Sequence, residues 1–356
     1  MTGIPPLQTF YVYLTSGCNC ACRHCYFVPA AGQTDNSRAD LLSPEKLRKA
    51  IVQALPLGLQ TLKWTGGEPT FHPRFAEFLA MQKELDLGAS LETNGMLIDR
   101  ALADLLRECG VGSVAVSLDG AQGATHDAIR GVSGGFVRTC AGIRDLVAAG
   151  YRPELILTLQ RTNVAELDEF FLLAEELGAG NVKLNVLQPM LRGADLSLAG
   201  ESLSVEELIQ LAKRLESARP AGAMPVNMDI PMAFQPLGRQ FAGSGCSVCG
   251  IRQILGILPR GEYALCGVGQ HFPALAMGAV DAVSLEEVWT SHPVLVGIRN
   301  GLPRDLRGIC GECLMRNACQ GCCVAANFQR TGELLAPFWF CQTAAEAGLF
   351  PRSRRK

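Results

Sequence analysis

The sequence predicts an α/β fold in which βα units form a parallel sheet curled toward a barrel, followed by a cysteine-rich C-terminal domain. From residue 9 onward, short runs of β-branched and aromatic residues alternate with stretches whose apolar residues recur at helical spacing. Nine of the 15 cysteines fall between Cys246 and Cys341. A chain of 356 residues is long enough for both parts.

The predicted elements follow in chain order. Strands are expected at Thr9–Leu14, Thr61–Trp64, Ser90–Glu92, Ser113–Ser117, Leu155–Leu159 and Val182–Val186. Helices are expected at Pro44–Leu55, Phe75–Leu85, Ala101–Glu108, Phe136–Ala149 and Ala165–Leu177. The first helix has a start signal, because Ser43 is a good N-cap and Pro44 suits the first helical position.

The second half is predicted from weaker signals. After the last strand we expect a loop over Gly193–Glu201, a helix over Ser204–Ala218 and a Pro- and Gly-punctuated connector over Pro220–Ala242. The predicted boundaries are 1–200 for the barrel, 201–242 for the connector, 243–345 for the cysteine-rich domain and 346–356 for a solvated basic tail.

Composition excludes several classes of protein. The net charge is −2, and the basic residues form no run before the last residues of the chain, so no nucleic-acid partner is expected. No apolar stretch reaches about 18 residues, and Met1–Gln8 does not have the pattern of a signal peptide. We therefore expect a cytoplasmic protein without a membrane partner, in which the cysteines are metal ligands rather than disulfides.

A cysteine loop follows the first predicted strand, with the spacing Cys18-x3-Cys22-x2-Cys25. Three thiolates at this spacing can hold three irons of a cubane and leave the fourth iron without a protein ligand. Such an open position allows a substrate group to bind the metal directly. The alternative is a structural zinc site, with His24 or Cys20 as the fourth ligand.

Glycine-rich and polar segments end the next strands. Gly66 and Gly67 allow a ligand to approach the backbone closely, and the Glu68 carboxylate can accept hydrogen bonds from an ammonium group. Asn94 and Asp119 end the third and fourth strands, where the alternative is that they only shape turns. These loops should meet at the carboxyl edge of the parallel strands.

Together these motifs resemble the radical S-adenosylmethionine (SAM) superfamily, whose fold is a partial (β/α)6 TIM-like barrel. The resemblance implies that SAM binds the open iron of a [4Fe–4S] cluster held by Cys18, Cys22 and Cys25, and is cleaved to a 5′-deoxyadenosyl radical that takes hydrogen from a substrate. Arg130 would supply a cation for the SAM carboxylate. The implied SAM-binding residues are Tyr26, Gly66, Gly67, Glu68, Pro69, Asn94, Ser117, Asp119 and Arg130.

The C-terminal cysteines resemble the SPASM domain, a module that carries auxiliary iron–sulfur clusters. The pattern is Cys246-x2-Cys249, Gly261-x4-Cys266, Cys310-x2-Cys313-x5-Cys319-x3-Cys323 and Cys341. The resemblance implies two further [4Fe–4S] clusters, one on Cys246, Cys249, Cys266 and Cys323 and the other on Cys310, Cys313, Cys319 and Cys341.

Three alternatives remain open for this domain. If Cys246 or Cys249 is not a ligand, the first auxiliary cluster has an open iron. Cys322 can replace Cys323 as a ligand. A zinc ribbon is the alternative to both clusters.

The resemblance also bears on the substrate. Gly267 follows the hairpin cysteine, where the sulfatase-maturating branch has an acidic residue, so that branch is disfavoured. Only 17 residues precede Cys18, so a peptide-recognition domain is not expected there, which favours tailoring of a small-molecule or sugar-bearing natural product, such as epimerisation. Cys322 and Cys20 are candidate hydrogen donors, whereas Cys109 and Cys140 are expected to be buried packing residues.

Two other functions are predicted as alternatives. One is maturation of a ribosomally made peptide by a thioether or C–C crosslink or by epimerisation. The other is an electron-transfer protein that does not cleave SAM. The resemblance implies a flavodoxin- or ferredoxin-type electron donor as a partner for the enzyme.

Overall fold

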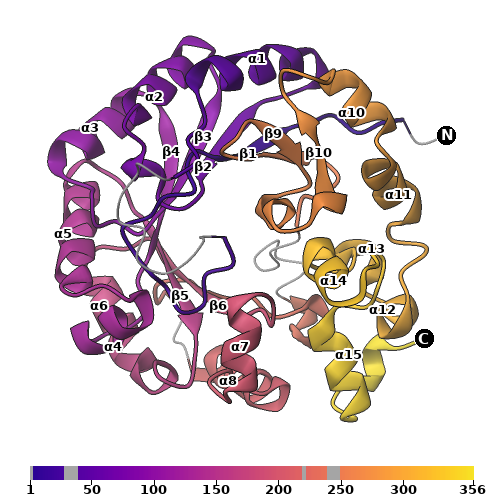
Figure 1. Cartoon of the computed structure of the whole chain (residues 1–356). Helices are drawn as coiled ribbons and strands as arrows, with labels where there is room; N and C mark the ends of the chain where they lie inside the picture. The colour runs from indigo at the N-terminus through magenta and orange to yellow at the C-terminus, as the bar shows by residue number, and fades with distance from the viewer. Residues whose placement is uncertain (1–2, 28–38, 219–221, 239–248) are drawn as a thin grey trace.

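The computed structural model of the chain describes residues 3–27, 39–218, 222–238 and 249–356. Its named strands form one ten-stranded sheet in the order β10-β9-β8-β1-β2-β3-β4-β5-β6-β7. The sheet curls, and helices from the first half of the chain cover its outer face, as Figure 1 shows. The predicted α/β partial barrel with a cysteine-rich C-terminal region is confirmed.

All the predicted strands are present. They are β1 (Thr9–Tyr13), β2 (Thr61–Thr65), β3 (Gly88–Thr93), β4 (Val111–Ser117), β5 (Glu154–Leu159) and β6 (Asn181–Val186). Neighbours from β1 to β6 pair in parallel. Burial alternates along β6, where Val182, Leu184 and Val186 are buried. Its other residues therefore face the inside of the barrel.

The predicted helices are also present. They are α1 (Pro44–Ala54), α2 (Phe75–Glu84), α3 (Arg100–Glu108), α5 (Gly135–Ala148), α6 (Leu167–Glu176) and α8 (Val205–Ala218). A further helix, α4 (Gly123–Arg130), follows β4. The predicted cap of α1 is confirmed, because the Ser43 hydroxyl accepts a hydrogen bond from the Lys46 N–H at 3.2 Å.

The prediction of a loop over Gly193–Glu201 is wrong, because α7 (Arg192–Leu198) lies there. Gly193 suggested a loop, but it is a packing residue: a Cβ at this position would lie 2.2 Å from the Gln188 carbonyl oxygen. The predicted connector also contains a strand, β7 (Val226–Met228), which pairs in parallel with β6. Its three residues are too few to show a period in the sequence.

The cysteine-rich region joins the same sheet. β8 (Ile254–Ile257) pairs in parallel with β1, and β9 (Glu262–Ala264) pairs antiparallel with both β8 and β10 (Ala276–Ala279). The helices that follow are α10 (Leu285–Ser291), α11 (Pro293–Gly301), α12 (Gly308–Glu312), α13 (Arg316–Cys319), α14 (Val324–Thr331) and α15 (Trp339–Glu346). The domain boundaries themselves remain a prediction.

The basic C-terminal tail was expected to be solvated, but hydrogen bonds hold it against the rest of the chain. The Leu314 N–H donates to the Arg354 carbonyl at 2.8 Å, and the Lys356 N–H donates to the Glu312 carbonyl at 3.0 Å. Arg355 Nε also lies 2.6 Å from a Glu312 carboxylate oxygen. Backbone pairing, which no charge pattern in the sequence reveals, therefore holds the tail against the region of α12.

A large buried cluster extends from Leu7 to Phe350 and includes residues of both the barrel and the cysteine-rich region. Cys109 and Cys140, with 7% and 5% of their surface exposed, belong to it, as expected of packing residues. Across the described ranges, the helices are too short or too polar to cross a membrane.

Candidate functional site

The carboxyl ends of the strands surround a cavity of about 360 Å³. Its lining brings together most of the residues predicted to hold the first cluster and SAM: Cys18, Cys22, Cys25, Tyr26, Gly66, Gly67, Glu68, Asn94, Ser117 and Arg130. Cys20 lines it as well. Pro69 and Asp119 do not line it, although both are predicted SAM contacts.

The cysteine loop is held by hydrogen bonds on two sides. On one side, the Gly67 and Glu68 N–H groups donate to the Thr15 and Gly17 carbonyls at 2.8 and 2.9 Å. On the other side, the Ala21 N–H donates to the Arg130 carbonyl at 2.9 Å. The loop is therefore clamped between the end of β2 and the C-terminus of α4.

The first clamp explains the two glycines after β2. A Cβ on Gly67 would lie 2.0 Å from the Gly17 carbonyl oxygen. Gly66 has φ +131°, a conformation that favours glycine, and a Cβ there would lie 2.9 Å from the Thr15 carbonyl oxygen. The backbone that these glycines approach is thus that of the cysteine loop. Their contact with SAM remains a prediction.

The sulfur atoms of the loop have the surroundings of thiolate ligands. The Cys20 N–H donates to Cys18 Sγ and the Phe27 N–H to Cys25 Sγ, both at 3.4 Å. A hydrogen bond from Cys20 and the charge of Arg130 hold the pKa of Cys22 well below its ordinary value, against the effect of burial. Because iron binds the thiolate, these residues fit a [4Fe–4S] cluster.

A single metal ion is a different case. In the ranges that the structure describes, no group of three or more His, Cys, Asp or Glu side chains has the spacing of a site for one metal ion. A cubane does not need such a group, because each of its cysteine ligands binds a separate iron.

Glu68 is buried at the end of β2, and its carboxylate joins that end to β3. Oε1 accepts hydrogen bonds from the Thr70 and Thr93 hydroxyls at 2.6 and 2.7 Å, and Oε2 accepts one from the Asn94 N–H at 2.7 Å. Burial raises the pKa of Glu68, and these hydrogen bonds oppose the rise. Because a carboxylate oxygen has two lone pairs, Oε2 keeps one acceptor site for a ligand.

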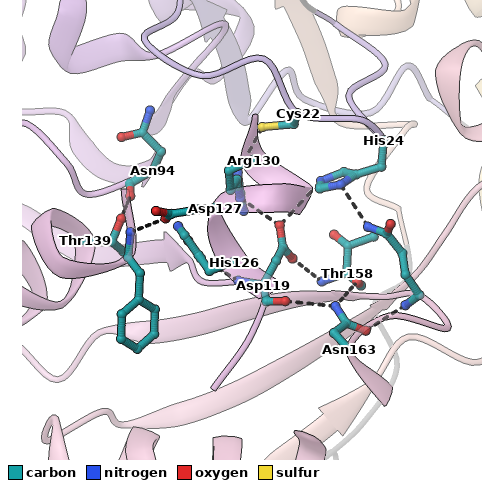
Figure 2. A network of polar contacts seen from close by, with 12 residues as sticks. Cys22, His24, Asn94, Asp119, His126, Asp127, Arg130, Thr139, Thr158 and Asn163 are labelled. Carbon is teal, nitrogen blue, oxygen red and sulfur yellow. Dashed lines mark hydrogen bonds and ion pairs between the residues drawn. The ribbon is translucent and has the colours of Figure 1, made fainter. Parts of the chain in front are cut away.

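Asp119 lies at the centre of a polar network, shown in Figure 2. Its Oδ2 atom is 2.7 Å from Arg130 Nε, and its Oδ1 atom accepts a hydrogen bond from the Thr158 N–H at 2.7 Å. His24 Nε2 lies 3.8 Å from the same carboxylate, and the Asn163 amide donates to the Asp119 carbonyl at 3.0 Å. Asp119 therefore positions Arg130 and the loop that follows β4.

This network also places Arg130 beside the cysteine loop. Its Nη1 atom lies 3.5 Å from Cys22 Sγ, so the guanidinium extends between Asp119 and Cys22 (Figure 2). Burial opposes ionisation of Asp119, but the charge of Arg130 holds the pKa of Asp119 below its ordinary value. A guanidinium has five N–H donors, so Arg130 can make these contacts and still face the cavity that it lines.

The C-terminal cysteines form two groups. Cys310, Cys313, Cys319 and Cys341 line one small cavity. Cys249, Cys266 and Cys323 form the other, since burial and then the charge of Cys323 raise the pKa of both Cys249 and Cys266. These groups match the two predicted ligand sets, apart from Cys246, which lies outside the described residues. The ligation itself remains a prediction.

The two candidate hydrogen donors lie in different places. Cys20 is buried and lines the main cavity. Cys322 does not line that cavity. Its charge contributes to the raised pKa of Cys341, so it lies near the group that contains Cys341. The structure thus brings only Cys20 to the cavity, and its role as a donor remains a prediction.

Several residues of the cavity were missed by the sequence analysis. Lys183, Asn185, Gln188 and Asp229 line the wall formed by β6 and the segment after β7. The alternation of polar and apolar residues in β6 was a usable signal for the first two. No sequence signal pointed to Asp229, because the strand that precedes it, β7, was not predicted. Gln188 also accepts a hydrogen bond from the Trp339 indole at 2.8 Å, which links the rim to α15.

Comparison with known proteins places this arrangement in context. Residues 12–174 match the Radical SAM superfamily. The chain is 30% identical over 317 residues to the mycofactocin maturase MftC of Mycobacterium tuberculosis (strain ATCC 25618 / H37Rv), covering 88% of this chain and 78% of that protein. It is 28% identical over 358 residues to the AdoMet-dependent heme synthase of Methanosarcina barkeri (strain Fusaro / DSM 804), covering 96% and 97%.

The fold matches solved structures as well. Streptococcus suis SuiB bound to its precursor peptide SuiA superposes with a TM-score of 0.72 at 16% identity, covering 95% of this chain and 76% of SuiB. At this identity the match establishes a shared fold and no more.

Proposed function

The chain belongs to the radical SAM superfamily, and from this premise we propose that it modifies a peptide by abstracting hydrogen from an unactivated C–H bond. One observation supports the proposal most. The three loop cysteines, Glu68 and Arg130 line one cavity at the carboxyl ends of parallel strands, where barrels of this kind carry their chemistry.

The residues of the cavity would bind the cluster and SAM in the following way. Cys18, Cys22 and Cys25 would hold the [4Fe–4S] cluster, which with bound SAM supplies the electron and the 5′-deoxyadenosyl radical. The free acceptor site on Glu68 Oε2 suits the SAM ammonium group. The Arg130 donors not used by Asp119 and Cys22 suit its carboxylate.

Two observations favour a peptide over the small-molecule or sugar-bearing substrate predicted above. A relative at 30% identity is named a maturase. SuiB, which shares the fold, binds a precursor peptide. The preference for a small-molecule substrate depended on the short segment before Cys18, and that segment does not determine how a peptide reaches the cavity. We therefore favour the peptide-maturation alternative and keep epimerisation and crosslinking as possible outcomes.

A second candidate substrate is a tetrapyrrole. The alignment with the heme synthase relative covers 96% of this chain and 97% of that protein, so the two sequences correspond over nearly their full length. This candidate belongs to the small-molecule class predicted from the sequence.

The proposal is tested with protein reconstituted with iron and sulfide under anaerobic conditions, reduced with dithionite and supplied with SAM. We expect 5′-deoxyadenosine to form, and its formation to be lost in the triple variant C18A/C22A/C25A. Absence of 5′-deoxyadenosine from the wild type would overturn the enzyme assignment in favour of an electron-transfer protein.

The substrate is then assigned by mass spectrometry, with two kinds of probe: any short peptide encoded beside the gene, and Fe-coproporphyrin III, the porphyrin after which another relative is named a synthase. A crosslinked peptide is lighter by two hydrogens, whereas an epimerised one keeps its mass in H2O and gains deuterium from D2O. Conversion of the porphyrin without conversion of any peptide would favour the second candidate.

A further inference from the structure

The wall of the cavity formed by β6 and the residue after β7 carries charges that make no hydrogen bond or ion pair with the residues that the structure describes. Among the described residues, Lys183 and Asp229 make no hydrogen bond or ion pair with their side chains. Asn185 Oδ1 is buried and accepts no hydrogen bond from the part of the chain that the structure describes. All three residues line the cavity that contains the cysteine loop.

Two other cations of the barrel, Lys63 and Arg130, are each paired with a carboxylate. Lys63 Nζ lies 2.5 Å from a Glu92 carboxylate oxygen. The Arg130 guanidinium lies 2.7 Å from Asp119. Removing a charge from water without a partner is costly, so partly buried, unpaired charges in a cavity are candidates for ligand contacts.

Lys183, Asn185 and Asp229 are neighbours. Lys183 pairs with Asn227 in the β6–β7 register, and Leu184 pairs with Met228. Continuing this register by one residue places Asp229 opposite Asn185, on the face that points into the barrel. Burial raises the pKa of Asp229, and the charge of the neighbouring Lys183 opposes this rise.

The charge of Asp229 also acts on Cys249 and Cys323 of the first auxiliary set. Burial raises the pKa of Cys249 and of Cys323, and the charge of Asp229 adds to both. Asp229 therefore lines the cavity of the cysteine loop and is also within electrostatic range of these cysteines. A substrate held here would lie near both predicted clusters.

Resting on the proposed peptide function, we propose that Lys183, Asn185 and Asp229 form the substrate-anchoring site and bind a carboxylate-bearing residue of the peptide. Lys183 donates to the substrate carboxylate. Asn185 Oδ1 and the Asp229 carboxylate accept hydrogen bonds from peptide N–H groups. The carboxylate belongs either to an acidic side chain or to the C-terminus of the peptide.

The test measures binding without turnover. The reconstituted, SAM-loaded and unreduced holoenzyme is titrated calorimetrically with three probes: acetyl-Ala-Ala-Ala with a free C-terminus, the same peptide as its C-terminal amide, and acetyl-Ala-Glu-Ala amide. At least one of the two acids should bind about 10- to 100-fold more tightly than the neutral amide, the range expected for a hydrogen bond to a charged group. The acid that binds more tightly identifies the source of the carboxylate.

Variants assign the effect to Lys183. K183Q should abolish the preference for acids, and K183R, which keeps the charge, should retain most of it. K83Q removes an exposed lysine of α2 and serves as the matched control. D229N should weaken all three peptides together, because their N–H groups are common to them.

Equal binding of the acids and the amide, or an acid preference that survives in K183Q, would overturn the anchoring site. Either result would leave SAM cleavage standing. Conversely, absence of 5′-deoxyadenosine would overturn the proposed function without changing the binding result. Melting temperatures and the cluster absorbance show that each variant is folded and loaded, and K183R provides the comparison if K183Q is not.

Discussion

Single contacts decide how the cysteine loop is presented. Gly67 leaves no room for a side chain against Gly17, and Asp119 holds Arg130 beside Cys22. Neither residue needs to touch SAM to be essential. The motif residues after β2 and β4 thus act first on the protein's own loop, and through it on the predicted cluster.

Gly67→Ala should displace the cysteine loop. The new Cβ would lie 2.0 Å from the Gly17 carbonyl oxygen, and neither backbone can give way cheaply. We expect a loss of about 1–3 kcal/mol in the free energy of unfolding, together with reduced iron content after reconstitution. Chemical denaturation and iron analysis provide the measurements.

Gly297→Ala is the matched control for this change, because a Cβ at position 297 of α11 meets no atom within 4 Å. It should be neutral or stabilise the helix by up to about 1 kcal/mol. If G67A binds as much iron as G297A, the close approach to Gly17 does not position the loop.

Asp119→Asn should destabilise the fold by about 3–5 kcal/mol, because it leaves the buried Arg130 cation without its partner. The pKa of Asp119 is below its ordinary value of 3.8, so its stabilising contribution is present above that pH and is lost as the pH falls through the lowered pKa. Urea denaturation of wild type and D119N between neutral and acidic pH measures this.

The difference in the free energy of unfolding between wild type and D119N should therefore become smaller at acidic pH. Asp104→Asn breaks the exposed ion pair with Arg100 and should cost no more than about 1 kcal/mol at any pH. A gap for D119N that stays constant down to the lowest pH would contradict the assigned ion pair.

At the level of elements, short segments carry much of the site. α4 holds the cysteine loop through its last backbone carbonyls, and β7 places Asp229, the residue that follows it, in the wall of the cavity. Both are short and carry weak sequence signals. Strongly patterned elements such as α1 instead form the outer layer, and their start and end signals determine their stability locally.

Ser43→Ala tests the local stability of α1. It removes the hydroxyl that accepts the Lys46 N–H at 3.2 Å and should lower the free energy of unfolding by about 1 kcal/mol. Ser43→Asp keeps an acceptor and should retain most of the stability. Equal losses in S43A and S43D, measured by thermal denaturation, would show that the cap contributes nothing.

At the scale of the whole molecule, one sheet joins the barrel and the cysteine-rich region. β8 pairs with β1, the strand that leads into the cysteine loop, so the auxiliary cysteines and the first cluster site share a rigid frame. The two auxiliary groups are also joined in sequence, because Cys319 belongs to one and Cys323 to the other. Loss of metal from this region should therefore also destabilise the barrel.

Chelation of iron from the reconstituted protein should lower the melting temperature of the whole chain in a single transition, because bound metal stabilises the folded state. Cys323→Ala should lower the iron content by one auxiliary cluster. Cys140→Ala is the control for iron content, because this buried cysteine of α5 lines neither the cavity of the cysteine loop nor that of Cys310, Cys313, Cys319 and Cys341. A melting temperature that does not depend on iron would contradict this coupling.

The sequence by itself determined the parallel strands, most of the outer helices, the cysteine loop and the two auxiliary cysteine sets. These are local signals. The periodicity of apolar residues, the capping residue Ser43 and the spacing of the cysteines can each be recognised without knowing which residues lie nearby in the fold. Weak local signals failed, as at α7 and β7, where close packing and strand pairing decide the conformation.

Only the tertiary structure decided what the polar residues contact. It placed Arg130 against Asp119 and Cys22, gave Glu68 four hydrogen bonds of which only one is on Oε2, and left Lys183 and Asp229 without a hydrogen bond or ion pair among the described residues. The reason is physical. A charged side chain has the same local signature whether it is paired or not, and its state depends on residues far away in the chain that folding brings to it.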